Sequence, residues 1–259
     1  MTAGLPGDAG LAAALAALAG APRLLVCCDF DGTLSTLADH PMAARPVDGA
    51  VAALDALAGL PDTWAAVISG RALIDLTQLA QMPGRVHLVG SHGNEFEVGR
   101  ILAVSPAEDG LLEALASRCR AITDGVAGAF VEAKPGSVAV HVRMAKRADA
   151  ERVLAAARRA AGSLPGVHVI EGKDLVELAV FPGAKGDAIH ALKERWDVTG
   201  VLFVGDDLTD ESGFAALGDG DVGVKVGGGS SQAMWRLPDP AAVVDLLARL
   251  ALARSLPAR

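Results

Sequence analysis

The feature that most constrains this chain is a buried strand that ends in two closely spaced carboxylates. The apolar run 24–28 is short and uninterrupted, which is typical of a strand covered on both faces of a parallel sheet. Asp29 and Asp31 follow it directly, and Gly32 and Thr33 come next. Ligands of open α/β sheets bind outside the carboxyl ends of the strands. Two acids at that place need a cation, a proton or a reacting group in order to be stable.

The order of strand, polar loop and helix recurs along the chain. We expect strands at 24–28, 64–68, 86–89, 201–204 and 222–226. We expect helices at 9–20, 46–59, 73–79 and 185–196, another that ends at Leu217, and a last one from about Pro240. This alternation predicts an α/β fold with a doubly wound parallel sheet.

The pattern changes in the middle of the chain. A short edge hairpin at 98–101 is followed by helical patterns at 107–122 and 148–161 and by strand patterns at 130–134, 138–143, 168–170 and 175–180. Helices beside a strand meander predict a small α+β module inserted into the sheet domain. We therefore expect residues 1–97 and 182–259 to form the core and residues 98–181 to form the insert.

Composition excludes several classes of function. The net charge is −8, aromatic residues make up 3% of the chain and tyrosine is absent, so we expect neither a nucleic-acid partner nor a membrane surface. Cys27, Cys28 and Cys119 lack metal-ligand spacing, and a reducing cytoplasm suits them. Residues 9–20 are apolar enough to suggest a signal peptide, but their helical leucine spacing favours a packed helix. We expect a cytoplasmic monomer or small homo-oligomer.

Polar residues follow the ends of the predicted strands. They are Asp29, Asp31, Ser69, His92, Asp206, Asp207 and Asp210, with Lys185 on a further loop. Because the carboxyl ends of parallel strands lie on one edge of a sheet, these residues are predicted to form one site. Clustered carboxylates with few histidines favour a hard cation, Mg²⁺ in particular. A lysine and a hydroxyl then suit the oxygens of a phosphate group.

Two acids beside a bound phosphate suggest covalent phosphoryl transfer. One carboxylate attacks phosphorus and forms an aspartyl-phosphate, while the other protonates the leaving alcohol and later activates water. In an extended chain, residues two apart face the same side, so Asp29 and Asp31 are able to share one pocket.

These motifs together resemble the haloacid dehalogenase superfamily. The first motif is Asp29-Phe30-Asp31-Gly32-Thr33-Leu34, and Ser69, Lys185 and Gly205-Asp206-Asp207-x-x-Asp210 follow in the family's order. The resemblance implies Asp29 as nucleophile and Asp31 as general acid and base. It implies that Ser69, Gly70 and Lys185 bind phosphate, and that Mg²⁺ is held by Asp29, the backbone carbonyl of Asp31 and Asp206, with Asp207 and Asp210 nearby.

Within that superfamily the chain is similar to trehalose-6-phosphate phosphatases. The similarity includes Ser69-Gly70-Arg71, Gly90-Ser91-His92-Gly93-x-Glu95, Glu171-Gly172-Lys173, and Glu132-x-Lys134 with Ser137-Val138-x-x-His141-x-Arg143. It implies that the insert is a mobile cap that reads the sugar and excludes water. Its expected sugar contacts are Arg71, His92, Glu132, Lys134, His141, Arg143, Glu171 and Lys173. No glycosyltransferase motif precedes the phosphatase motifs, so we expect another protein to make the trehalose 6-phosphate.

Other interpretations of these residues stay open. Ser69-Gly70, Glu171 and Lys173 also fit turns, Arg71 and Lys185 also fit solvated side chains, and Asp206 also fits a helix N-cap. His92 also fits a loop histidine, and the alternating charges at 132–143 also fit a solvated sheet face. Phosphatases for sucrose 6-phosphate or a glycosyl-glycerate phosphate would use the same core motifs. A catalytically silent sugar-phosphate-binding protein is the non-enzyme alternative.

Overall fold

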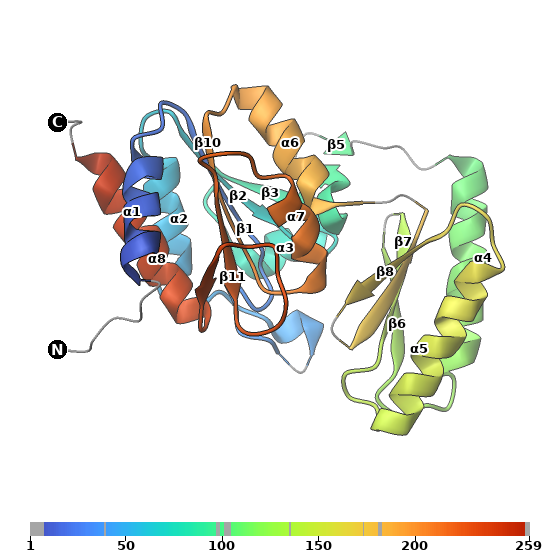
Figure 1. The fold of residues 1–259 in the computed structure, drawn as a ribbon. Coiled ribbons are helices and arrows are strands. Elements are labelled where there is room, and N and C mark those ends of the chain that lie inside the picture. Colours follow the sequence, from blue (N-terminus) through green and yellow to red (C-terminus); the bar gives the residue numbers. More distant parts are fainter. Residues whose placement is uncertain are drawn as a thin grey trace. The chain divides into compact units, whose positions relative to one another are not determined.

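The computed structural model describes residues 8–38, 40–96, 99–100, 105–134, 136–172, 174–180 and 183–256 (Figure 1). The chain divides into two compact units. The core unit comprises Met1–Val98, Ala184–Asp206 and Asp210–Arg259, and the cap unit comprises Gly99–Gly183 with Asp207–Thr209. Of the residues predicted to contact the sugar, Lys173 lies outside the described residues.

The larger sheet is mainly parallel. Its strands are β1 (Leu24–Cys28), β2 (Thr63–Ile68), β3 (Val86–Gly90), β4 (Glu95–Phe96), β5 (Gly99–Arg100), β10 (Gly200–Gly205), β11 (Val222–Val226) and β12 (Trp235–Leu237). The spatial order is β12-β11-β10-β1-β2-β3-β4-β5. All pairs from β12 to β3 are parallel, and β4 runs antiparallel to β3. The predicted doubly wound α/β fold is confirmed.

The central strand β1 is buried on both faces. Leu24, Val26 and Cys28 pack into one hydrophobic cluster, whereas Leu25 and Cys27 pack into another. This division follows from the two-residue period of a strand, which sends successive side chains to opposite faces. A strand without any polar side chain is therefore stable only in the middle of a covered sheet.

Helices cover both faces of this sheet (Figure 1). They are α1 (Asp8–Ala19), α2 (Ala50–Ala58), α3 (Leu73–Ala80), α6 (Lys185–Trp196), α7 (Glu211–Ala215) and α8 (Pro240–Ser255), with short 3-10 turns η1 (Pro41–Ala43), η2 (Ser91–Gly93) and η3 (Leu208–Asp210). The helices α1, α2, α3 and α8 contribute to the first cluster, and α6 and α7 contribute to the second. Among the helices of the described residues, none combines the length and the apolarity needed to span a bilayer.

The cap unit has an antiparallel sheet of four strands. These are β6 (Phe130–Lys134), β7 (Ser137–His141), β8 (His168–Gly172) and β9 (Leu175–Ala179), in the order β6-β7-β9-β8. The helices α4 (Pro106–Thr123) and α5 (Arg147–Gly162) pack on one face, against buried side chains that include Val138, Val140 and Leu178. We call the opposite face of this sheet, which carries Glu132 and Glu177, the polar face.

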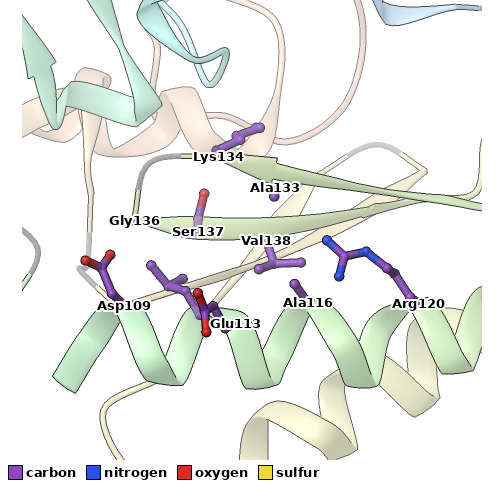
Figure 2. Close-up of a pocket in the computed structure, with 10 residues that line it drawn as sticks. Asp109, Glu113, Ala116, Arg120, Ala133, Lys134, Gly136, Ser137 and Val138 are labelled. Atoms are coloured by element: carbon purple, nitrogen blue, oxygen red, sulfur yellow. The ribbon is translucent and has the colours of Figure 1, made fainter. Parts of the chain in front are cut away.

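A groove lies between α4 and the β6–β7 hairpin of the cap unit (Figure 2). Its volume is about 600 Å³. Asp109, Glu113 and Arg120 line it from the helix, and Lys134 and Ser137 line it from the hairpin. All of its lining residues belong to the cap unit, and the charged residues from the helix are exposed.

One predicted helix start differs from the structure. Pro46 was expected to open a helix, but it pairs with Ser35 in an isolated bridge, and the N–H of Val47 donates to the carbonyl of Leu34. The helix α2 begins only after Gly49, whose φ of 87° is readily adopted only by glycine. Proline adopts nearly the same φ at a helix start and in an extended bridge. The presence of Pro46 therefore did not show which of these two structures it forms.

The sequence also missed β12 and misjudged the end of β8. The strand β12 has three residues, and its exposed Arg236 interrupts the apolar pattern. The strand β8 continues through Glu171 and Gly172, which were expected to lie in a turn. Near the predicted hairpin at 98–101, the structure has β4 and β5, while residues 97, 98 and 101 lie outside the described ranges.

Shortening a core side chain of α8 should destabilise the protein far more than shortening an exposed one on the same helix. Leu247 is fully buried and Leu252 is 66% exposed. We expect Leu247→Ala to lower the free energy of unfolding by about 2–5 kcal/mol, because it leaves a cavity. Leu252→Ala should change it by less than about 0.5 kcal/mol. Urea denaturation measures both, and equal effects would contradict the packing described here.

Candidate active site

Polar side chains meet where neighbouring strands of the larger sheet end. Asp29 follows β1, Ser69 follows β2 and Asp206 follows β10. Since β2 and β10 run parallel to β1 on its two sides, these residues lie on one edge of the sheet. Lys185 begins α6 and Asp210 directly precedes α7, and both side chains reach the same place.

Lys185 joins two carboxylates at the centre of this edge. Its Nζ donates to Oδ1 of Asp29 at 2.5 Å and to Oδ1 of Asp210 at 2.6 Å. Its side chain is only 2% exposed. The other oxygen of Asp210 accepts the backbone N–H of Asp206 at 2.8 Å. An ammonium at a helix N-terminus is electrostatically unfavourable, so these carboxylates explain why Lys185 occupies that position.

The electrostatics of the cluster leave an excess of negative charge. Burial raises the pKa of the Asp29 carboxyl well above its usual value, the nearby Lys185 opposes this rise, and Asp210, Asp206 and Asp31 add to it. Burial lowers the pKa of the Lys185 ammonium, but the charges of Asp210 and Asp29 outweigh it, and the net direction is upward. Lys185 therefore stays charged, while Asp29 needs a further positive charge to ionise easily.

Three of these acids are placed to hold a metal ion together. Asp29, Asp206 and Asp210 each offer a carboxylate oxygen, and the three atoms lie within 4.8 Å of one another. Gly32 has a φ of 84°, and a Cβ there would collide with the carboxylate of Asp206. The chain thus keeps this space clear for Asp206. A set of oxygen donors with surplus negative charge fits a hard divalent cation.

Two other residues of the predicted metal set do not join this group. The side chain of Asp31 accepts hydrogen bonds from Arg71, which leaves only its backbone carbonyl for the predicted role. Oδ1 of Asp207 accepts the N–H of Leu208 at 2.7 Å, and Asp207 belongs by its contacts to the cap unit. The metal assignments of Asp31 and Asp207 stay predictions.

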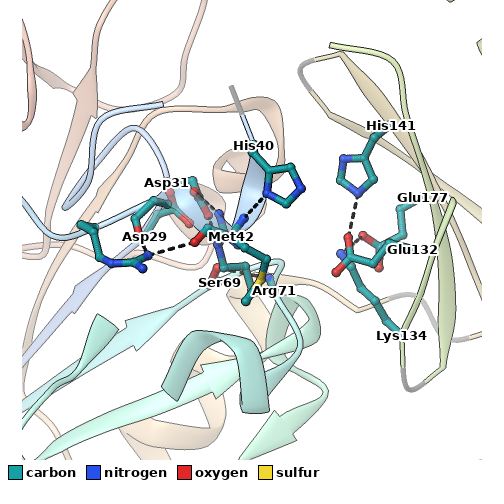
Figure 3. A network of polar contacts seen from close by, with 12 residues as sticks. Asp29, Asp31, His40, Met42, Ser69, Arg71, Glu132, Lys134, His141 and Glu177 are labelled. Atoms are coloured by element: carbon teal, nitrogen blue, oxygen red, sulfur yellow. Dashed lines mark hydrogen bonds and ion pairs between the residues drawn. The ribbon is translucent and has the colours of Figure 1, made fainter. Parts of the chain in front are cut away.

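Asp31 and Arg71 form a bidentate ion pair (Figure 3). Nε of Arg71 donates to Oδ2 of Asp31, and Nη2 donates to Oδ1, each at 2.6 Å. The guanidinium also lies 5.7 Å from the ring centroid of Phe30. The sugar contact assigned to Arg71 from the sequence stays a prediction. The structure joins it to the second acid instead.

Ser69, Gly70 and His92 come together at the ends of β2 and β3. The Oγ of Ser69 accepts the backbone N–H of Arg71 at 3.2 Å, and its carbonyl accepts the N–H of His92 at 2.9 Å. A Cβ on Gly70 would collide with the imidazole of His92, which therefore lies directly over this glycine. His92 is buried and its φ is 54°, in the left-handed region that few side chains adopt.

Glu95 stabilises this strained turn, although it is not among the site residues predicted from the sequence. Ser91 precedes His92 with a φ of 48°. Oε2 of Glu95 accepts the Oγ–H of Ser91 at 2.8 Å and the backbone N–H of Leu73 at 2.9 Å. Its place in the motif Gly90-Ser91-His92-Gly93-x-Glu95 was the available signal. Consecutive residues at positive φ persist only where such contacts hold them.

Lys225 is a second buried cation, and it is not among the site residues predicted from the sequence. It lies on β11 opposite Gly205, is buried, and its Nζ donates to the backbone carbonyl of Asp206. A single lysine within the apolar run Val222–Val226 was the available signal, because buried lysines are rare unless paired.

The polar face of the cap sheet carries two hydrogen-bonded pairs of charged or titratable side chains (Figure 3). Nε2 of His141 lies 2.7 Å from Oε2 of Glu132 in hydrogen-bond contact. Nζ of Lys134 donates to Glu177 at 2.8 Å, and the Oγ–H of Ser137 donates to the same carboxylate at 2.5 Å. Burial raises the pKa of Glu132, but His141 and Lys134 outweigh this and the net direction is downward. Three predicted residues, Glu132, Lys134 and His141, thus share one face.

Glu177 was missed, although it is only 2% exposed. The sequence feature that could have identified it is that Glu177 is the single acidic residue in the apolar strand Leu175–Ala179. A carboxylate buried in that position needs the two donors that Lys134 and Ser137 supply.

Two further predicted cap residues, Glu171 and Arg143, have partners outside these pairs. Glu171 accepts two hydrogen bonds of 2.7 Å from the guanidinium of Arg158 on α5, so its carboxylate lies on the helix-covered side of the sheet. Nε of Arg143 lies 3.9 Å from the carboxylate of Asp174, and both side chains are partly exposed. The sugar-binding assignments of Glu171, Arg143 and Lys173 stay predictions.

Sequence comparisons place this site in a known family. The trehalose-phosphatase family model matches residues 27–240, which include all the core motifs. A trehalose-phosphate phosphatase of Mycobacterium marinum is 36% identical over 245 residues, covering 89% of this chain and 62% of that protein. A trehalose-6-phosphate phosphatase of Escherichia coli K12 is 34% identical over 213 residues, covering 81% of this chain and 79% of that protein. The chain therefore spans about three-fifths of the mycobacterial relative's length.

A solved structure has the same fold over nearly the whole chain. The C-terminal domain of a trehalose-6-phosphate phosphatase from C. albicans superposes with a TM-score of 0.82 at 23% identity, covering 97% of this chain and 98% of that one. The family match includes the strand-end motifs that form the buried cluster of Asp29, Lys185, Asp206 and Asp210. The chain belongs to the trehalose-phosphatase family.

Proposed function

We propose that this chain hydrolyses trehalose 6-phosphate to trehalose and phosphate, with Mg²⁺, through an aspartyl-phosphate on Asp29. The observation that carries the proposal is the buried cluster in which Asp29 touches Lys185 and shares a potential cation site with Asp206 and Asp210. Membership of the trehalose-phosphatase family supports the substrate.

Asp29 is the nucleophile in this proposal. One of its oxygens attacks phosphorus, and the bond between phosphorus and the sugar oxygen breaks. Asp29 suits this role because Lys185 holds one of its oxygens and fixes the direction of the other. Ser69 and the N-terminal end of α6 at Lys185 are placed to bind the phosphate oxygens, with the ammonium stabilising the charge on them.

Mg²⁺ would be held by Asp29, Asp206 and Asp210 or by part of this set. When bound, it supplies positive charge to the phosphate and offsets the repulsion among the carboxylates. Lys225 donates to the backbone of Asp206 and thereby keeps that residue at the edge of the cluster.

Asp31 is the general acid and base. It donates a proton to the departing sugar oxygen in the first step. In the second step, it accepts a proton from the water that attacks phosphorus, and Asp29 is released. An alkoxide is a poor leaving group, so this proton transfer is required for a sugar phosphate more than for a phosphate ester with an acidic alcohol.

The cap unit supplies the sugar recognition. We propose that residues 98–181 are an inserted cap domain and that residues 1–97 and 182–259 are the phosphatase core; the division of the chain into two compact units supports this. Glu132, His141, Lys134 and Glu177 offer donors and acceptors for sugar hydroxyls on one face. A polar site of this kind rejects sugars that leave its groups unpaired.

A panel of sugar phosphates tests the substrate. With Mg²⁺, we expect phosphate release from trehalose 6-phosphate to exceed release from sucrose 6-phosphate and a glycosyl-glycerate phosphate by at least about tenfold in kcat/KM. A chelator should reduce it to background. Equal rates on all three would remove the substrate assignment, and binding without turnover would favour a silent sugar-phosphate-binding protein.

Replacing the nucleophile should abolish turnover while the protein still folds. We expect Asp29→Asn to reduce kcat by at least about a thousandfold, since the amide oxygen is a poor nucleophile. Asp48→Asn is the matched control, because Asp48 is exposed and belongs to the same unit. Near-normal turnover of Asp29→Asn would show that another residue attacks phosphorus.

Removing one metal ligand should weaken Mg²⁺ binding without unfolding the protein. Asp206→Asn takes one carboxylate from the cluster, and we expect the dissociation constant of Mg²⁺, measured by calorimetry without substrate, to rise at least about tenfold. The exposed Asp245→Asn serves as control. Unchanged affinity in Asp206→Asn would exclude this residue from the metal site.

A further inference from the structure

The pairing of Arg71 with Asp31 goes beyond what the proposed reaction requires of either residue. Both oxygens of Asp31 accept from a single guanidinium, through two separate bonds of 2.6 Å. A planar guanidinium that binds a carboxylate in this way fixes its rotation as well as its position. Arg71 therefore fixes the orientation of the Asp31 carboxylate.

Arg71 is itself held from several sides. Its backbone N–H donates to Oγ of Ser69, and its carbonyl accepts the N–H of Ser91 at 2.7 Å. Its guanidinium rests over the ring of Phe30, which is fully buried, and its side chain is only 13% exposed. These contacts tie Arg71 to the ends of three strands. A side chain so fixed is able to transmit that rigidity to the group it binds.

We propose that Arg71 is the positioning residue that orients Asp31 for proton transfer to and from the substrate; this inference rests on the proposed function. When one oxygen of Asp31 carries the proton, the bond from Arg71 to the other oxygen keeps the carboxyl group oriented. No other reactant is needed. The proton leaves Asp31 for the sugar oxygen in the first step and returns from water in the second.

This role differs from that of a sugar ligand, which the sequence suggested for Arg71, and from that of a phosphate ligand. A ligand for the substrate would affect every phosphate ester or every sugar. A positioning residue for the general acid matters only where the leaving oxygen needs a proton. The nature of the leaving group therefore separates positioning from phosphate binding, and a double-mutant cycle with Asp31 separates positioning from sugar binding.

The test is the rate of the first chemical step, followed by rapid mixing with Mg²⁺, for two substrates. One is trehalose 6-phosphate, and the other is p-nitrophenyl phosphate, whose phenolate leaves without a proton. We expect Arg71→Gln to slow the first step about tenfold to a hundredfold with the sugar phosphate. The p-nitrophenolate burst should slow far less. Arg71→Lys, which keeps the charge but not the fork, should fall between the wild type and Arg71→Gln.

A double-mutant cycle supplies the second readout. If Arg71 acts through Asp31, adding Arg71→Gln to Asp31→Asn should change the first step with sugar phosphate by less than about threefold. Equal losses on both substrates, or a full additive loss in the double variant, would overturn the proposal. Thermal unfolding of each variant checks the fold, and Arg71→Lys replaces Arg71→Gln should that variant unfold.

Failure of the proposed function gives a different result. If the wild type shows the p-nitrophenolate burst but leaves trehalose 6-phosphate intact, the substrate assignment fails. The comparison of leaving groups then uses the sugar phosphate that the panel identifies, and the same two outcomes decide the role of Arg71.

Discussion

The site depends on one buried interaction, the contact of the Lys185 ammonium with Asp29 and Asp210. An ammonium in this position loses its hydration, which costs several kcal/mol unless carboxylates replace the water. Two short contacts do so, and the charge is retained. Because Asp206 adds a third carboxylate, the cluster still carries surplus negative charge. That imbalance is the physical reason for including a divalent cation in the proposed chemistry.

Much of this arrangement could be predicted from the sequence because it follows from periodicity. A run such as Leu24–Cys28, apolar at every position, has no exposed face and therefore belongs inside a covered parallel sheet. The apolar runs at 64–68 and 201–204 are predicted to be parallel strands for the same reason. The residues that follow these strands must then lie on one edge of the sheet. The juxtaposition of Asp29, Ser69, Lys185 and Asp206 needed no knowledge of side-chain positions. The cap sheet was predictable for the same reason.

The remaining features depend on which side chains meet, and local patterns do not contain that information. The pairing of Arg71 with Asp31 joins residues 40 positions apart, and that of Lys134 with Glu177 joins residues 43 positions apart. Glu171 was grouped with Glu132 by motif, yet it faces Arg158 on the helix-covered side, since the register of β8 against β9 decides its direction. Lys225 and Glu177 were single charges in apolar runs, and they show that such exceptions to a pattern mark places where a partner is required.

In the proposed reaction Asp29, held by Lys185, receives the phosphoryl group. Acid quenching during turnover with Mg²⁺, followed by borohydride reduction of the acyl phosphate and peptide mass spectrometry, measures this most directly. We expect the peptide containing residues 24–31 to be modified, with Asp29 converted to homoserine, and we expect a chelator to prevent the modification. Modification at another residue, or turnover with no modified carboxylate, would show that Asp29 is not the nucleophile.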